Sequence, residues 1–360
     1  MLRRLIFFLW LLPFTALGQY RITGKVTDLV DKKPVANASV FLNNASAGSK
    51  TNDDGTFTIT GVRGGQYELV VSVVGYTTYR QTILVNSDIT LPVIEIISKA
   101  IELREVNIHP DPNWAKHYDM FREEFLGHSE NAAQCKILNP KVIYFQYDNT
   151  NRELTASSSD FIEIENKALG YKVKYQLSSF TKNYSTSLFY FEGTASFENL
   201  QGSKSAIRRW DKNRLKTYEG SSMNFLRSVI IGGFHEQGFT VLRLIRKPNP
   251  GYSGGLNNKY LETLVTTSLT VSDFVKLTDK KGIYALSFSD CLYVLYNEAK
   301  NDKSLKPLNV ASILTFEEPY SFFDNNGIII NPQSVIFEGQ WAKSRVADLL
   351  PVDYEPVKEK

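Results

Sequence analysis

The chain has 360 residues, of which 42% are hydrophobic and 12% aromatic, and its 41 basic side chains stand against 38 acidic ones. This composition is typical of a folded globular protein and excludes a disordered one. Because the charges nearly balance, nothing in the overall charge attracts the chain to nucleic acid, and we expect no nucleic-acid partner.

The first 18 residues have the pattern of a secretory signal peptide. Arg3 and Arg4 precede an apolar run that ends before Pro13, and small residues lead up to Gly18. We expect cleavage after Gly18, which leaves 39 basic residues. The apolar run is short for a membrane helix, which needs about 20 residues, and an uncleaved anchor is the alternative interpretation.

The residue directly after the expected cleavage site is Gln19 and not cysteine, so a lipid anchor at that end is not expected. No later apolar run approaches the length of a membrane helix, and we expect no transmembrane segment in the mature chain. The predicted location is the periplasm or the outer membrane surface.

Residues 19–97 alternate between apolar and polar side chains, which predicts strands with one buried face. Phe57 and Ile59 alternate with threonines. In residues 39–43 the same alternation places Phe41 on the outward face.

Turn residues separate these predicted strands. Asp53-Asp54-Gly55 suits a tight hairpin with a positive φ, and Gly64-Gly65 is predicted to do the same before the next strand. Short strands joined by such turns, without a helical period, predict an all-β antiparallel sandwich.

The region resembles the carboxypeptidase regulatory-like domain, a transthyretin-like β-sandwich common at the start of exported Gram-negative envelope proteins. The resemblance implies an accessory module and no activity of its own. The matching positions are Gly24, Val26, Pro34, Ala38, Val40, Asp54, Gly55, Phe57, Gly65, Tyr67, Leu69, Gly75 and Tyr76.

The zinc carboxypeptidase that the family name suggests is not expected here. That chemistry needs a His-x-x-Glu pair and a distant histidine. No glutamate stands three residues after any of the four histidines, which are His109, His117, His128 and His235. We therefore expect no bound metal, no cofactor and no enzyme.

An extended linker is predicted over residues 98–111 and a second domain over 112–355, with a short tail at 356–360. Asp111 is predicted to cap a helix that starts at Pro112 and stops at Gly127. Strand patterns alternate with grouped helices in the rest, which predicts an α+β domain with a mainly antiparallel sheet.

A serine cap and a glycine stop at Gly232-Gly233 delimit the second helix predicted there. Predicted helices are 203–218, a second one after Ser221 or Ser222, and 340–350; predicted strands are 142–147, 161–164, 171–177, 188–191, 239–245, 284–288, 292–296, 313–316 and 335–337.

Several strings of this region resemble a domain of unassigned role that follows the regulatory module in envelope proteins. The resemblance carries no catalytic assignment. The strings lie at residues 121–127, 135 with 139–140, 169–175, 218–221, 225–227 and 349–354.

Gly251-Tyr-Ser253-Gly-Gly255 matches the nucleophile-elbow pattern of serine hydrolases. That fold needs an acid and then a histidine later in the chain, and no histidine follows His235. We interpret the segment as a glycine-rich turn, and we expect no catalytic residue.

A basic and aromatic patch is the one candidate binding site. It could grip phosphate or carboxylate groups of lipid or glycan, and the alternative is a solvated helix face. Its residues are Lys204, Arg208, Arg209, Trp210, Lys212, Arg214 and Arg227.

Cys135 and Cys291 are the only cysteines. An oxidising compartment permits a disulfide between them. The alternative is two buried thiols that never meet, because sequence alone does not supply the Cα separation that pairing requires.

Together these features predict an exported, non-enzymatic binding or structural protein of the cell envelope. Its partner would be an envelope protein, an anionic lipid headgroup or a glycan. The alternative hypothesis is a hydrolase of envelope polymer with its site in the second domain.

Overall fold

The computed structural model describes residues 19–98, 111–253, 259–297 and 311–356. The predicted signal peptide, most of the predicted linker and most of the tail lie outside these residues. The described chain is mainly antiparallel sheet with a few helices, as predicted, and it has three hydrophobic cores.

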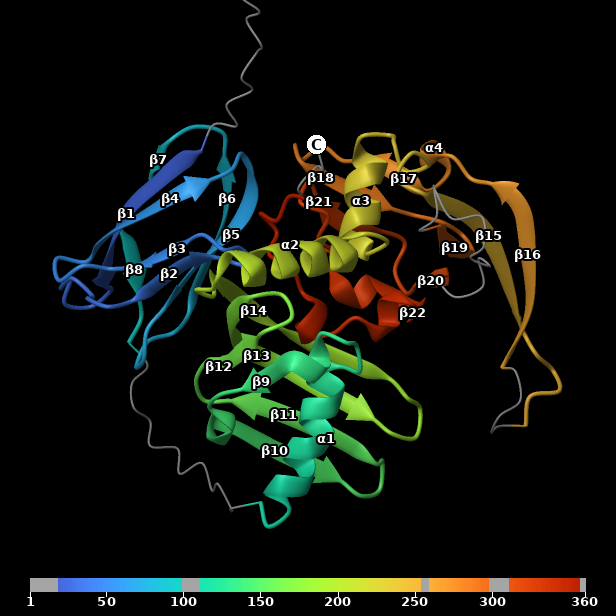
Figure 1. Cartoon of the computed structure of the whole chain (residues 1–360), viewed down its shortest axis with the longest axis horizontal. Helices are drawn as coiled ribbons and strands as arrows, with labels where there is room; N and C mark the ends of the chain where they lie inside the picture. The colour runs from blue at the N-terminus through green and yellow to red at the C-terminus, as the bar shows by residue number, and fades with distance from the viewer. Residues whose placement is uncertain (1–18, 99–110, 254–258, 298–310, 357–360) are drawn as a thin grey trace, which may run out of the picture.

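The first core lies inside a two-sheet sandwich, drawn in blue in Figure 1. One sheet has the order β4-β1-β7, with β8 also paired to β1, and the other has the order β3-β2-β5-β6. The strands are β1 (Tyr20–Asp28), β2 (Ser39–Leu42), β3 (Gly48–Lys50), β4 (Thr56–Val62), β5 (Gly65–Ser72), β6 (Tyr79–Val85), β7 (Ile89–Thr90) and β8 (Ile94–Ile96).

The predicted alternation is confirmed in β4, where Phe57 and Ile59 are buried and the threonines at 58 and 60 are exposed. It is wrong for Phe41, which is only 4% exposed. The Phe41 side chain does not belong to the sandwich core. Its ring packs edge-on against Phe161, which precedes β12 (Ile162–Asn166), with the two ring centroids 6.0 Å apart. Contact between two parts of the chain thus buries a side chain that the alternation placed in water.

The predicted turn at Gly55 is confirmed, with a φ of 78°. A Cβ atom there would lie 2.4 Å from the Val26 carbonyl oxygen, so the site requires glycine. The second turn prediction is wrong, because Gly61 and not Gly64 or Gly65 has the positive φ.

The second core lies between α1 (Trp114–Leu126) and a six-stranded sheet of order β10-β11-β13-β12-β9, with β14 also paired to β13. Phe121 and Phe125 of α1 stack on each other and meet Phe180 of the sheet. The strands are β9 (Cys135–Ile137), β10 (Ile143–Asp148), β11 (Glu153–Ser158), β12 (Ile162–Asn166), β13 (Tyr171–Asn183) and β14 (Phe189–Asn199).

Helix α1 begins two residues later than predicted, with Asn113 at its N-cap. Asp111 does not cap it in the predicted way. Its carboxylate accepts a hydrogen bond from the Asn113 backbone N–H at 2.9 Å and contacts His117 Nδ1 at 2.6 Å. Gly127 ends the helix as predicted, with a φ of 89°.

The third core lies between helix α3 (Ser222–Ile230) and two sheets of orders β16-β15-β19-β20-β22 and β17-β18-β21. Phe225 of α3 sits at its centre, against Phe239 and Trp341. The elements are β15 (Phe239–Pro248), β16 (Tyr260–Ser268), α4 (Val271–Phe274), β17 (Val275–Leu277), β18 (Ile283–Leu286), β19 (Cys291–Tyr296), β20 (Ala311–Phe316), β21 (Ser321–Asp324) and β22 (Val335–Gly339).

Helices α2 (Lys204–Tyr218) and α3 (Ser222–Ile230) follow the second sheet, and α2 crosses the middle of Figure 1 where the three parts meet. The predicted serine cap of the second helix is confirmed at Ser221, and Ser203 also caps α2. Ser203 Oγ accepts from the Ala206 N–H at 3.3 Å, and Ser221 Oγ accepts from the Asn224 N–H at 3.1 Å.

The predicted helix over 340–350 is wrong. The segment forms two short 3₁₀ turns, Trp341–Lys343 and Val346–Asp348, with extended backbone at Ser344 and Arg345 between them. The reason is packing: Trp341 belongs to the third core and Val346 to the second, and a single helix would not reach both.

Residues 351–355, here called the C-terminal staple, connect the cores. Val352 is buried in the sandwich core and Tyr354 in the second core. Between them, Asp353 accepts a hydrogen bond from the Ser46 hydroxyl at 2.6 Å.

The β2–β3 turn completes this attachment. The Asn44 N–H donates to the Ala195 carbonyl of β14 at 2.7 Å, and the Asn44 carbonyl accepts from the Val352 N–H at 2.6 Å. Ala45 also forms a parallel bridge with Ser196. The sandwich is therefore packed onto the rest of the chain by backbone pairing as well as by side chains.

Candidate functional site

A cleft of about 860 Å³ lies where the second and third cores meet. Five separate stretches of chain line it: the end of α1 with the loop after it, Lys182 near the end of β13, the last turns of α2 with the connection to α3, Tyr296 at the end of β19, and residues 340–348. Ligand sites form preferentially at such junctions. We call it the inter-core cleft and treat it as the candidate site.

The Asp348 carboxylate lines the cleft and is held in place by hydrogen bonds from neighbouring side chains. Its Oδ1 accepts hydrogen bonds from Ser129 Oγ at 2.8 Å and from Asn131 Nδ2 at 2.9 Å. Asn131 Nδ2 also donates to Thr217 Oγ1 at 3.0 Å, so this amide ties the α1 loop to α2. Burial raises the pKa of the Asp348 carboxyl, and the two side-chain hydrogen bonds oppose that rise.

Two ion pairs neutralise four of the other charges in the cleft. Glu124 and Lys182 form an ion pair of 3.1 Å in which both side chains are largely buried. Glu130 and Lys216 pair at 3.0 Å near the rim. The Arg345 guanidinium lies over the Phe189 ring, 4.1 Å from its centroid, and burial lowers the pKa of that guanidinium.

The cleft also contains polar groups that bond to nothing else. Four lining side chains make no hydrogen bond or ion pair within the described residues. They are the amides of Gln134 and Gln340, the Lys343 ammonium and the Ser344 hydroxyl. All four belong to exposed residues. Two amides, one hydroxyl and one ammonium are therefore available to a ligand.

The geometry of the cleft does not assemble a nucleophile with a base. Ser129 Oγ donates to a carboxylate, and the one lining histidine, His128, contacts only Glu123, at 3.7 Å. Among the described lining residues no hydroxyl is hydrogen-bonded to an imidazole. The amides and hydroxyls that line the cleft can donate and accept hydrogen bonds.

The structure divides the predicted basic patch in two. Lys204, Arg208, Arg209 and Lys212 are exposed along α2, and none forms an ion pair or hydrogen bond within the described residues. Lys204, Arg208 and Lys212 are spaced four residues apart and share one helix face. This half remains available to an anionic partner.

Trp210 and Arg214 do not belong to that surface. Trp210 is 7% exposed, and its indole N–H donates to the Lys167 carbonyl at 3.0 Å. Arg214 donates from Nε to the Leu169 carbonyl at 2.7 Å and lies 3.9 Å from the Tyr171 ring centroid. Both fasten α2 to the six-stranded sheet.

Arg227 is also a structural residue. Its guanidinium donates to three backbone carbonyls, those of Asn326 at 2.9 Å, Val352 at 2.7 Å and Tyr354 at 2.9 Å. It therefore holds the C-terminal staple against α3, and the prediction that it binds a ligand is wrong.

Both cysteines are free thiols, so the disulfide interpretation is wrong and the alternative holds. Cys135 packs on the second core, and Cys291 lies in β19 of the five-stranded sheet. Burial raises the pKa of the Cys135 thiol to about 12, which makes it unreactive near neutral pH.

The structure also bears on the serine-hydrolase pattern, on metal binding and on membrane-spanning helices. Residues 254 and 255 of the Gly251–Gly255 pattern lie outside the described residues. In the part of the chain that is described, no three histidine, cysteine, aspartate or glutamate side chains come together as metal ligands, and no helix has both the length and the apolar character to cross a bilayer.

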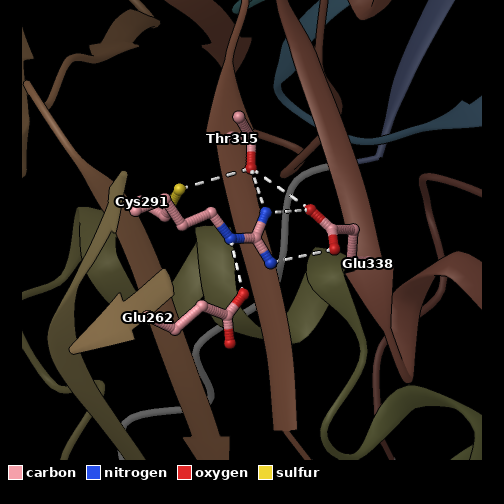
Figure 2. Close-up of polar contacts among 5 residues, drawn as sticks. Glu262, Cys291, Thr315 and Glu338 are labelled. Atoms are coloured by element: carbon pink, nitrogen blue, oxygen red, sulfur yellow. Dashed lines mark hydrogen bonds and ion pairs between the residues drawn. The ribbon is translucent and has the colours of Figure 1, made fainter. Parts of the chain in front are cut away.

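A polar network that the sequence did not suggest runs across the five-stranded sheet (Figure 2). Arg246 binds Glu338 with both Nη atoms, at 2.5 and 3.0 Å, and donates from Nε to Glu262 at 2.8 Å. Thr315 Oγ1 accepts from Arg246 at 3.2 Å and contacts Cys291 Sγ at 3.4 Å. Each of the five strands supplies one of these side chains, so the network fixes the sheet as a unit.

The network predicts a pH-dependent stability. Hydrogen bonds from Arg246 hold the pKa of the Glu338 carboxyl below its ordinary value. This contribution is present above the unfolded-state pKa, about 4.3, and is lost as the pH falls through the lowered folded-state value. Urea unfolding should show Glu338→Gln less stable than wild type by about 1 kcal/mol at pH 7, with the gap closing towards pH 3.

The matched control is Glu317→Gln, an exposed glutamate for which no ion pair is found among the described residues. It should change the free energy of unfolding little at either pH. A gap for Glu338→Gln that stays constant from pH 7 to pH 3 would contradict the assignment of the effect to this carboxylate.

Residues 22–108 match the family described as CarboxypepD_reg-like domain. The resemblance drawn from the residues is confirmed, and the chain carries a CarboxypepD_reg-like domain as its N-terminal sandwich. A comparison with curated proteins finds no match.

Several solved structures are distantly similar. A type II cohesin–X-dockerin complex of Acetivibrio cellulolyticus is 18% identical over 21% of this chain and 56% of that chain, with a TM-score of 0.20. The pilus 2b backbone protein of group B streptococcus is 23% identical over 22% and 42%, with a TM-score of 0.19. A DUF3823 family protein from Bacteroides ovatus is 11% identical over 51% and 100%, with a TM-score of 0.19.

The chain thus spans about half the length of the first two of these proteins. Their similarity is too distant to carry an argument about function, which has to come from the site itself.

Sequence reasoning did not find the inter-core cleft. Its lining residues come from stretches more than 200 positions apart, such as Ser129 and Asp348, and they include no motif. The one local signal in the sequence is that two predicted helices, within residues 200–235, separate two groups of predicted strands. That pattern does not show which side chains line a cleft between the two groups.

Proposed function

We propose that the protein is a non-catalytic binding protein of the cell envelope and that the inter-core cleft takes a glycan. The observation that carries the proposal is the division of polar groups in the cleft. Ion pairs neutralise two of its acids and two of its bases, whereas the groups without a partner among the described residues are the amides of Gln134 and Gln340, the Ser344 hydroxyl and the Lys343 ammonium.

Amides and hydroxyls both donate and accept hydrogen bonds, as sugar hydroxyls do. A cleft with balanced charge attracts neither strong anions nor strong cations over a neutral polyol. The single ammonium would tolerate a carboxylate or phosphate substituent on the sugar. The CarboxypepD_reg-like sandwich is then the accessory module, packed against the binding part through the staple.

The exposed cations of α2 support an anionic lipid headgroup as a second partner. Lys204, Arg208, Arg209 and Lys212 face water and form no ion pair among the described residues, because Asp211 of the same helix pairs with Arg214. This contact would lie on the helix surface, outside the cleft. Location in the periplasm or at the outer membrane rests on the predicted leader, and cell fractionation tests it.

The cleft proposal predicts saturable binding of envelope oligosaccharides. Trp341 lines the cleft, so titration of the purified chain with neutral oligosaccharides and with muropeptides should change its tryptophan fluorescence. Loss of two hydrogen bonds costs about 2 kcal/mol, so the double variant Gln134→Ala, Gln340→Ala should bind at least tenfold more weakly.

The matched control is Gln333→Ala, which removes an exposed amide outside the cleft and should leave the affinity unchanged. Binding to anionic vesicles is measured in a separate experiment, because it tests the exposed cations of α2 and not the cleft. Equal loss in the control and the double variant would remove the cleft as the site. Cleaved sugar in the mass spectrum of the mixture would support the hydrolase alternative.

A further inference from the structure

Strand β16 has a long, open edge. It ends the five-stranded sheet, and among the described residues it pairs with β15 alone. Eight of its nine residues are exposed and Val265 is half-buried. Figure 1 shows β15 and β16 extending together at the outer rim of the molecule.

Every second N–H and C=O group of such an edge points away from the sheet and can pair with another strand. Natural proteins usually protect an edge with lysine, proline or free charge. Strand β16 has no lysine or proline, and its one charged residue, Glu262, is ion-paired with Arg246, which Glu338 also binds. The exposed aliphatic side chains are Leu261, 54% exposed, and Leu264, 41% exposed.

We propose that β16 pairs antiparallel with β16 of a second copy of this chain, which joins two five-stranded sheets into one. A two-fold axis perpendicular to the joined sheet keeps each side chain on its own face. Residues that face each other across the two strands must then both have odd numbers or both have even numbers. The axis therefore lies level with one residue, which faces its own copy in the second chain.

Charge and regularity select the register. An axis through Glu262 would place two carboxylates opposite each other, which is unfavourable. An axis through Thr263 places Leu261 opposite Val265 of the second copy and Glu262 opposite its Leu264. It also keeps the pairing within the regular part of β16, because the pairing with β15 shifts register after Val265.

A pair of short strands buries less than the ~1,200 Å² of a stable interface. We therefore expect a concentration-dependent dimer and not an obligate one. Analytical ultracentrifugation of the chain from Gln19 onward should show a monomer–dimer equilibrium. Thr263→Lys places two ammonium groups opposite each other at the axis and should shift the dissociation constant at least tenfold towards monomer.

The control is Thr82→Lys, an exposed threonine on β6 of the sandwich, which should leave the equilibrium unchanged. A chain that is monomeric at every concentration would overturn the proposal. So would a dimer that Thr263→Lys leaves intact, because that dimer would use another surface.

Cross-linking tests the register separately. Opposite residues in a strand pair have Cβ atoms about 5 Å apart, so Thr263→Cys should form an intersubunit disulfide on mild oxidation. Ser268→Cys lies five residues from the axis, about 30 Å from its copy, and should not cross-link. Equal cross-linking of both variants would overturn the proposed register.

Discussion

Replacing Arg227 by methionine is expected to lower the free energy of unfolding by about 3 kcal/mol or more. The guanidinium donates to the carbonyls of Asn326, Val352 and Tyr354, and a hydrogen bond from a charged donor contributes about 1.5–3 kcal/mol. Methionine keeps much of the apolar volume but leaves three carbonyls without this donor. Urea unfolding measures the loss.

The effect should be largest where the staple holds the parts together. Limited proteolysis of Arg227→Met should therefore release the C-terminal residues and expose the sandwich before the rest of the chain unfolds. The matched control is Arg208→Met, because Arg208 is exposed on α2 and has no hydrogen bond or ion pair among the described residues. It should change stability by less than about 0.5 kcal/mol, and equal losses in both variants would contradict the role given to Arg227.

The contrast between these two arginines explains why sequence placed both in one binding patch. A surface cation and a buried one look alike in a sequence when the partners of the buried one are backbone carbonyls, because carbonyls belong to every residue type. The partners of Arg227 lie about 100 and 125 positions away. The exposed cations of α2 were predictable from helical spacing, and the internal ones were not.

The fold was more predictable than the site because its signals are local. Alternation in β4 and the cap at Ser221 depend on neighbours within a few residues. Two of the wrong predictions involve contact between parts of the chain. Phe41 is buried by Phe161, and the 340–350 segment cannot be one helix because Trp341 and Val346 serve different cores.

Replacing Gly170 by alanine is expected to destabilise the protein by about 2–5 kcal/mol. Gly170 has a φ of 69°, a conformation that costs an L-residue about 1–2 kcal/mol. A Cβ atom there would also lie 2.2 Å from Trp210 Cδ2, which forces α2 away from the six-stranded sheet. Crowding of this kind adds about 1–3 kcal/mol. Chemical denaturation measures the sum.

Gly232→Ala separates the two causes. Gly232 has a nearly identical φ of 70°, but a Cβ atom there meets nothing within 4 Å. It should cost only the backbone part, about 1 kcal/mol. Because α2 also carries Lys216 and Thr217 into the inter-core cleft, displacement of Trp210 should weaken oligosaccharide binding in Gly170→Ala and not in Gly232→Ala. Equal stability losses at the two glycines would mean that the indole moves aside freely and that its packing does not position the helix.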